Sequence, residues 1–412
     1  MAFVAWLRLP FPATGTAWAE DAWVFLAGSV DGEGVFTPYQ GYLHVVPRLI
    51  SDLVTAVVPL AGWATAMAAA SCIVVGLVGA GLYLCSGAVL THRPIRVALA
   101  FLPALVPLAG VEMLGNAANL HTYLLFLLPW LLLARIDTWP RAVAAAVAGF
   151  LIGTTEIQAL LFLPLALVGV RNPKRLPLLG AVALAALAQV VITLTTPRVP
   201  DEHEANTIAD SAYSYAFQTL GGSWTTRGAA LGEAVHQHGL LLVVAPGAFA
   251  LLALLVWAAV VAQNRARIML VALGAAGVLL WFAAVWVNPG PQFTYSEFTA
   301  ETFANPPLTR YAAVSSLFLF GTALVAVDAL LARRSWPTRV AAAVLAAAML
   351  FAAVTNFSLE STMRSYGPVW SDQVTTAETG CRAEPTGTVR ITAAPRPDRW
   401  FTDLPCSVVL RR

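Results

Sequence analysis

Two adjacent acidic residues, Glu20 and Asp21, stand between Trp18 and Trp23 near the start of the chain. Tryptophan is enriched where a membrane meets water, which accounts for the aromatic residues but not for the acids. A carboxylate at that depth is costly to ionise unless it is paired, so it serves as a general base, a metal ligand or the partner of a cation. Alternatively, the two acids cap the first turn of a helix that runs to Gly28. Asp21 is the stronger candidate for a functional role.

Three polar side chains, Tyr42, His44 and Arg48, follow a turn at residues 38–41 on an otherwise apolar stretch. That stretch predicts an amphipathic helix to about Val58, lying in the membrane interface. His44 and Arg48 are four residues apart and therefore share one face of the helix. The forked donors of Arg48 suit a phosphate group. Alternatively, the arginine snorkels and Tyr42 is an ordinary interfacial residue.

Short turns between apolar segments carry five further polar side chains: Glu112, Asn116, Asn119 and His121 in one turn, and Glu156 in a later one. Hydrogen-bonding groups at the edge of hydrocarbon are costly without partners, so we expect these side chains to line a binding site. The alternative is structural, with the two asparagines capping helices and the histidine satisfying a neighbour.

Arg310 and Tyr311 open a late apolar segment. This position places the arginine where it could hold the phosphate of a lipid. Snorkelling of a long cationic side chain to the interface is again the alternative.

The segments that must position these residues are strongly apolar. The chain has 412 residues, is 58% hydrophobic and 11% charged, and has a mean hydropathy of +0.73. A soluble core of this size would carry far more charge. We predict an all-α polytopic bundle of about 10–11 transmembrane helices, each needing roughly 20 residues to cross the membrane. The apolar segments are 60–88, 97–113, 119–134, 141–156, 157–170, 176–196, 239–262, 267–287, 311–332 and 338–355.

Charge divides the loops of this bundle into two groups. Alternate loops are basic and contain only Asp137 and Asp328 as acids: Arg93, Arg96, Arg135, Arg141, Arg171, Lys174, Arg175, Arg265, Arg267, Arg333, Arg334 and Arg339. Because Lys and Arg in short loops remain cytoplasmic, these loops are expected inside the cell. Twenty of the 22 acidic residues fall on the other side. The segments expected outside are 1–59, 197–238, 288–310 and 356–412.

This orientation divides the chain into an external first loop with an interfacial helix (1–59), a transmembrane bundle (60–355) and an external C-terminal segment (356–412). The last part contains Cys381 and Cys406, which we expect to form a disulfide because the external compartment is not reducing. Two free thiols are the alternative. Short strands are predicted at residues 388–392 and 407–410.

The first residues do not have the pattern of a secretory signal. Pro10, Pro12 and Gly15 break any helix well short of about 20 residues, and a basic n-region is missing. We expect either a first transmembrane helix upstream of Met1, or residues 2–9 as the outer end of that helix.

Together these motifs resemble the GT-C superfamily of integral-membrane glycosyltransferases. The shared layout is an acidic pair in the first external loop, a juxtamembrane helix, external hairpins with Asn and His, and an Arg-Tyr pair opening a late helix. The resemblance implies a polyprenyl-phosphate sugar donor and a first-loop acid as catalytic base or metal ligand. By position, Asp21 or Glu20 takes that role, with Asp21 preferred, and His44, Arg48 and Arg310 receive the donor phosphate. An incomplete first helix and a small external tail depart from the family pattern.

The resemblance implies an inverting glycosyltransferase on the external face of the bacterial plasma membrane, with a glycan, lipid or protein hydroxyl as acceptor. An arginine takes up the developing phosphate charge and a carboxylate accepts the hydroxyl proton. No cofactor is required for this chemistry, no Cys/His spacing predicts a resident metal, and a divalent metal is compatible with it. The net charge of +2 argues against a nucleic-acid partner. The competing hypotheses are a multi-pass transporter, a flippase for lipid-linked sugars and a non-catalytic scaffold.

Overall fold

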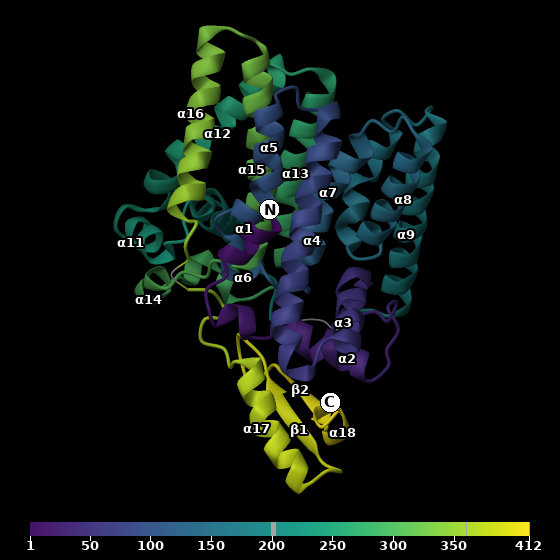
Figure 1. Ribbon diagram of the computed structural model, residues 1–412. Helices are drawn as coiled ribbons and strands as arrows, with labels where there is room; N and C mark the ends of the chain where they lie inside the picture. The colour runs from purple at the N-terminus through teal and green to yellow at the C-terminus, as the bar shows by residue number, and fades with distance from the viewer. Residues whose placement is uncertain (199–202, 360, 412) are drawn as a thin grey trace.

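The computed structural model describes residues 1–198, 203–359 and 361–411. It is a tall helical bundle with a small module attached to one end (Figure 1). Within the described residues, six helical segments are long and apolar enough to cross a membrane. Their main helices are α4 (Trp63–Cys85), α9 (Leu176–Thr195), α12 (Leu240–Val261), α13 (Asn264–Val287), α15 (Arg310–Ala332) and α16 (Trp336–Thr355). The predicted all-α polytopic bundle with short C-terminal strands is confirmed.

Shorter apolar helices complete the bundle. They are α5 (Arg93–Leu105), α7 (Leu120–Leu133), α8 (Trp139–Gly153) and the 3₁₀ segment η5 (Ile157–Leu167). The predicted segment 97–113 is not continuous, because helix α5 ends at Leu105 and a separate short helix, α6 (Ala109–Glu112), follows. The reason is Pro107, which lacks an amide and forces the preceding Val106 into an extended conformation (ψ 125°).

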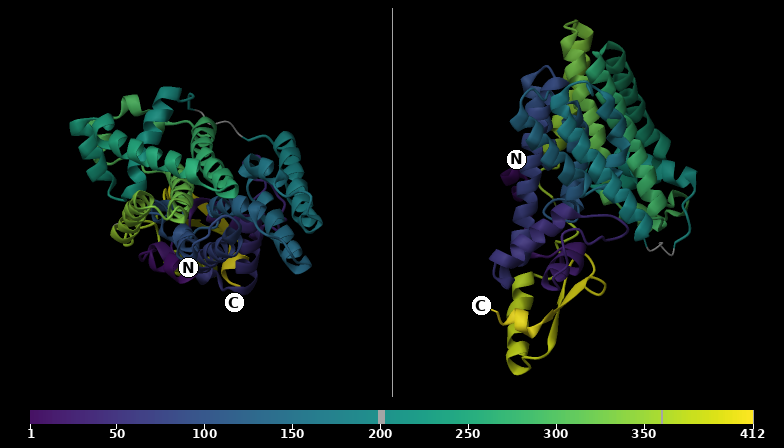
Figure 2. Two further views of the ribbon diagram at one scale, coloured as in Figure 1. Left: turned by 90° about the horizontal axis from the view of Figure 1, so that it is seen from above. Right: turned by 90° about the vertical axis from the view of Figure 1, so that its right-hand side faces the viewer.

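Helix α15 lies at the centre of the bundle and α12 at its periphery. In the most apolar 18-residue window of each helix, 83% of α15 is buried inside the protein, against 17% of α12. Around α15 pack α13, α16, α12 and α5. Seen along its long axis, the bundle places α8 and α9 to one side of this group (Figure 2). A helix opening with Arg310 therefore carries that residue into the middle of one end of the bundle.

The basic turns meet at one end of the bundle. Asp328, near the end of α15, accepts the backbone amides of Thr91 (2.9 Å) and His92 (2.8 Å) from the turn before α5. Arg333 donates to the carbonyl of Val261 (2.9 Å), which joins the α15–α16 turn to the α12–α13 turn. At the top of Figure 1 these turns lie away from the C-terminal module.

The first 59 residues pack along α4. Helix α1 (Ala2–Leu7) ends before Pro10 and brings Ala2 against Gly76 of α4. A π-helix, η2 (Asp21–Leu26), continues into α2 (Ala27–Val30). The expected amphipathic helix is present as α3 (Val45–Val57). Other short helices lie between the long ones: α10 (Ile208–Ser214), the π-helix η7 (Tyr215–Gly221), η8 (Gly222–Trp224), α11 (Gly228–His238) and α14 (Ala300–Ala304).

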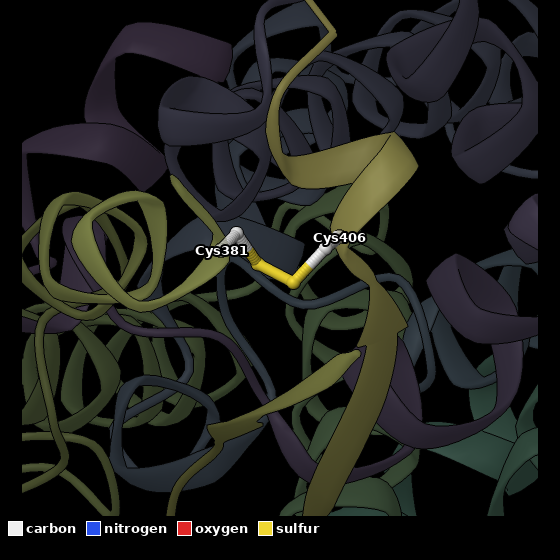
Figure 3. The surroundings of a disulfide bond; sticks show 2 residues. All are labelled: Cys381 and Cys406. Carbon is white, nitrogen blue, oxygen red and sulfur yellow. A yellow bond between two sulfur atoms is a disulfide. The ribbon is translucent and has the colours of Figure 1, made fainter. Parts of the chain in front are cut away.

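The C-terminal module consists of α17 (Trp370–Ala383), β1 (Thr388–Thr392), β2 (Phe401–Pro405) and α18 (Cys406–Val409). The strands are antiparallel, with Thr388 opposite Pro405 and Thr392 opposite Phe401. The predicted strand at 407–410 is wrong, because residues 407–409 belong to a one-turn helix that Leu410 ends, and the strand lies just before it. Such a short apolar run fits either structure. A disulfide joins Cys381 of α17 to Cys406 of α18 (Figure 3), the pair that the sequence predicts.

Candidate active site

The hairpin between α6 and α7 is held by charged side chains from distant parts of the chain. Asp21 accepts the amides of Ala117 (2.9 Å) and Ala118 (2.8 Å). Arg364 donates to the carbonyls of Gly115 (2.7 Å) and Leu114 (2.5 Å). Irregular backbone buried at the edge of a membrane needs such partners, because water does not reach it. The hairpin is therefore fixed by two charged side chains that are distant from it in the sequence.

Asp21 is buried and both of its oxygens are engaged by the hairpin. Burial raises the pKa of its carboxyl to about 7, although the two amides and the charge of Arg364 lower it. Neither Asp21 nor Glu20 caps the helix that starts there, because no side-chain capping bond forms at its first turn. The geometry thus gives Asp21 a positioning contact with the hairpin.

Arg310 brings together the acids of the first loop and of the hairpin. Its Nη1 lies 3.4 Å from Glu20 Oε1 and 3.6 Å from Glu112 Oε1. Its backbone amide donates to Glu112 Oε2 (3.1 Å), and its guanidinium lies 5.3 Å from the ring centre of Tyr311. The side chain of Arg310 is still 31% exposed, so it remains accessible to a ligand.

Glu20 has a free oxygen beside this cation. Its side chain is 13% exposed, and Oε2 is buried without a hydrogen-bond partner among the described residues. Burial raises the pKa of Glu112, while the nearby Arg310 lowers it. A carboxylate with one unsatisfied oxygen next to an accessible cation can accept a proton while the cation holds an anion.

Two tyrosines and a second arginine border this group. Burial, and then the charge of Glu20, raises the pKa of Tyr39 to about 12, while Arg310 and Arg198 lower it. Tyr42 senses the charges of Glu156, Arg310, Arg198 and Glu20, and its pKa is raised mainly by burial. Tyr39 belongs to the site, since its ring centre lies 5.7 Å from that of His44. The charge of Arg198 acts on both tyrosines, and neither Tyr39 nor Arg198 was among the residues predicted.

His121, in the first turn of α7, is hydrogen-bonded to Glu156 in the turn after α8. Glu156 is additionally fixed by the amide of Gln158 (2.8 Å). The ring of His44 lies 4.0 Å from that of Tyr42, and burial lowers its pKa, as does the neighbouring His121. These residues were predicted from three separate segments. They lie in one region, beside Arg310 and its two acids.

The two asparagines serve the hairpin itself. Asn116 donates to the carbonyl of Glu112 (2.6 Å) and accepts the amide of Asn119 (2.9 Å). Neither caps a helix with its side chain in the way the sequence allowed, since the first turn of α7 receives no side-chain capping bond.

Arg48 is engaged by another partner. It is buried, forms a 2.8 Å ion pair with Glu33 and lies 5.8 Å from the ring centre of Phe25. Glu33 was not predicted, because nothing in its loop distinguishes it from a solvated acid. Within the described ranges, no three His, Cys, Asp or Glu side chains are grouped so that they could hold a metal ion.

Comparison with known proteins gives little further information. No family model matches the chain, and no curated protein matches it. A crystal structure of the Archaeoglobus fulgidus oligosaccharyltransferase, in complex with Zn and sulfate, is similar at 15% sequence identity with a TM-score of 0.40. The match covers 93% of this chain and 55% of that one, so the chain spans about half the length of the protein it matches. A superposition this loose transfers no residue role and no reaction.

Proposed function

We propose that this protein is a membrane glycosyltransferase that moves a sugar from a polyprenyl-phosphate donor to an acceptor hydroxyl, at the external face of the bacterial plasma membrane. One observation carries the proposal. At the first turn of α15, an accessible Arg310 lies 3.4 Å from Glu20, whose second oxygen is buried and unpartnered within the described chain. Cation and base thus lie together where a lipid phosphate enters the interface.

The chemistry assigns one role to each group. The acceptor oxygen forms a bond to the anomeric carbon while the bond from that carbon to the phosphate oxygen breaks, which inverts the configuration. The proton of the hydroxyl passes to Glu20 as general base. The electron pair of the broken bond remains on the lipid phosphate, whose growing charge is stabilised by Arg310. A metal is not required by this scheme, because an arginine neutralises a monophosphate ester.

Glu20 suits the role of base better than Asp21, the residue that the sequence favoured. Both oxygens of Asp21 already accept backbone amides, and a proton placed there would compete with those bonds. Glu20 has one oxygen near Arg310 and one to spare. We therefore propose Glu20 as the base and Asp21 as the residue that fixes the hairpin beside it.

A transporter or flippase would need its polar groups along a path through the bundle. The arginine–glutamate cluster instead gathers at one end, at the first residue of α15 and the last of α6. An end-on cluster favours a reaction at the interface.

The test is sugar transfer from a polyprenyl-phosphate sugar in membranes that contain each variant at matched expression. We expect Glu20→Gln to lower the transfer rate by about 10²–10⁴-fold, the usual loss for a general base. The matched control is Glu301→Gln, an exposed acid on the same side of the bundle. If Glu20→Gln and Asp21→Asn both transfer sugar at the parental rate, the glycosyltransferase proposal is wrong for this site; altered uptake of a solute with unaltered transfer would indicate a transporter.

A further inference from the structure

Three aromatic side chains from separate segments meet beside the candidate active site. Trp23 contacts Trp400 edge to face, with ring centres 5.5 Å apart, and Tyr39 in the same manner at 6.3 Å. Trp23 is still 47% exposed after both contacts. Part of its ring therefore remains open to a ligand.

Trp400 belongs to the C-terminal module, which is hydrogen-bonded to the first loop at this point. The amide of Ala394 donates to the carbonyl of Ala17 (3.0 Å), and Trp18 pairs with Ala394 as an isolated parallel bridge. The amide of Ala393 in turn donates to the carbonyl of Trp400 (2.8 Å). These bonds fix the Trp400 ring against the loop that carries Glu20.

The aromatic group adjoins the proposed base. Glu20 is the N-cap residue of the π-helix η2 and Trp23 is the third residue of that helix, so the two residues are less than one turn apart. Tyr39 lies close enough to Glu20 and Arg310 for their charges to affect its phenol. A molecule that stacks on this group is therefore bound beside the proposed base.

We propose that Trp23, Tyr39 and Trp400 form a platform that binds a carbohydrate acceptor, an inference that rests on the proposed glycosyltransferase function. The C–H face of a sugar ring packs on an aromatic face, whereas its hydroxyl groups need polar partners at the rim. Such partners are present, because Arg399 lies 5.5 Å from the Trp400 ring centre and the neighbouring Arg396 and Asp398 are exposed. A lipid acceptor fits less well, since this rim is charged and belongs to a module below the membrane-spanning helices (Figure 2).

The experiment measures binding of oligosaccharides to the full chain purified in detergent. The probes are tetrasaccharide fragments of mannan, galactan, arabinan and glucan, with a short peptide and a diacylglycerol as other acceptor classes. Binding is followed by tryptophan fluorescence and by equilibrium dialysis for Trp23→Ala, Trp400→Phe and their double variant. The matched control is Trp139→Ala, which removes a 57% exposed tryptophan at the start of α8.

We expect at least one oligosaccharide to bind, and Trp23→Ala to weaken its binding about tenfold, as loss of one stacking face of about 1.4 kcal/mol would do. Trp400→Phe, which keeps an aromatic ring against the loop, should weaken it less, and Trp139→Ala should leave it unchanged. The platform is refuted if no oligosaccharide binds, if peptide or diacylglycerol competes at the same rings, or if Trp23→Ala binds as the parent does at matched thermal stability. The parent protein separates the two ideas: oligosaccharide binding by the parent without any sugar transfer would refute the reaction and leave the platform intact. Glu20→Gln should bind the oligosaccharide while transferring sugar about 10²–10⁴-fold more slowly.

Discussion

At each end of the bundle a buried aspartate holds an irregular turn; the turn at Ala117 and Ala118 is buried, whereas Thr91 is exposed and His92 is half-buried. At one end, Asp328 accepts the consecutive amides of Thr91 and His92; at the other, Asp21 accepts those of Ala117 and Ala118. Both aspartates are only 2% exposed. At the hairpin the carboxylate replaces the water that a buried irregular turn would otherwise need, whereas the turn at Thr91 remains within reach of water.

The surroundings of the two aspartates differ. Around Asp328 the remaining contacts are also internal, from the hydroxyl of Thr91 (3.0 Å) and the ring of His92 (2.8 Å). Around Asp21 a second, neighbouring acid has a spare oxygen and faces an accessible Arg310. A buried carboxylate is therefore weak evidence of catalysis; an unsatisfied one beside a cation is stronger evidence.

The largest expected effect concerns the two ends themselves, which we predict to lie on opposite sides of the membrane. A reporter that works only in the cytoplasm should be active when it is fused after Arg175 or Arg267. A reporter that works only outside the cytoplasm should be active when it is fused after Asp210 or Gly380, because the basic turns remain inside. Reversal of any one fusion would place the proposed site on the wrong face.

The next effect distinguishes the two arginines that the sequence offered for the donor phosphate. Arg310→Ala should lower sugar transfer by about 10²–10³-fold, the loss typical of removing one donor to a developing negative charge. Arg48→Ala should act mainly on stability, since Arg48 is buried against Glu33 and Phe25. Transfer rates and thermal midpoints of both variants, measured on the same preparations, check this contrast. Equal losses of sugar transfer in the two variants would show that Arg48 also serves the donor phosphate.

The sequence predicted the elements of this molecule better than their contacts. Apolar length and flanking charge located the long helices from α4 to α16, because each signal is contained within one segment. The same reasoning misjudged residues 97–113, where a single proline overrides the apolar pattern. It also placed the second strand on Ser407–Leu410, a run too short to separate strand from helix.

Residue types indicated the site, but the roles depended on distant partners. The acids, the histidines and Arg310 were recognisable because polar groups at membrane depth are costly. Nothing local distinguished Glu20 from Asp21, since the difference lies in amides about a hundred residues away. Arg198, Tyr39 and Trp400 were missed for the same reason: an isolated arginine, tyrosine or tryptophan outside an apolar segment carries no signal of its neighbours.

The smallest expected effect concerns the two aspartates, Asp21 and Asp328, that accept the backbone amides of a turn. Asp21→Asn and Asp328→Asn each put an amide group, with one acceptor only, in front of two backbone donors. We expect Asp21→Asn to destabilise the protein by about 1–3 kcal/mol, the cost of one unsatisfied buried donor. Asp328→Asn should destabilise it less, because the exposed Thr91 has access to water. Thermal or denaturant unfolding in detergent measures this loss. A fully stable Asp21→Asn would show that the hairpin does not need its carboxylate.

The pH dependence of stability tests whether burial, or the two amides and Arg364, dominates the pKa of Asp21. Burial raises the pKa of its carboxyl from 3.8 to about 7, whereas the amides of Ala117 and Ala118 and the charge of Arg364 lower it. The folded protein then holds a proton that the unfolded chain has released, so the contribution to stability is fully present below about pH 3.8 and lost as the pH rises through about 7. The unfolding midpoint of the parent should therefore fall more steeply over this window than that of Asp21→Asn. If the parent instead gains stability relative to the variant as the pH rises, the amides and Arg364 outweigh burial, and Asp21 is ionised at neutral pH.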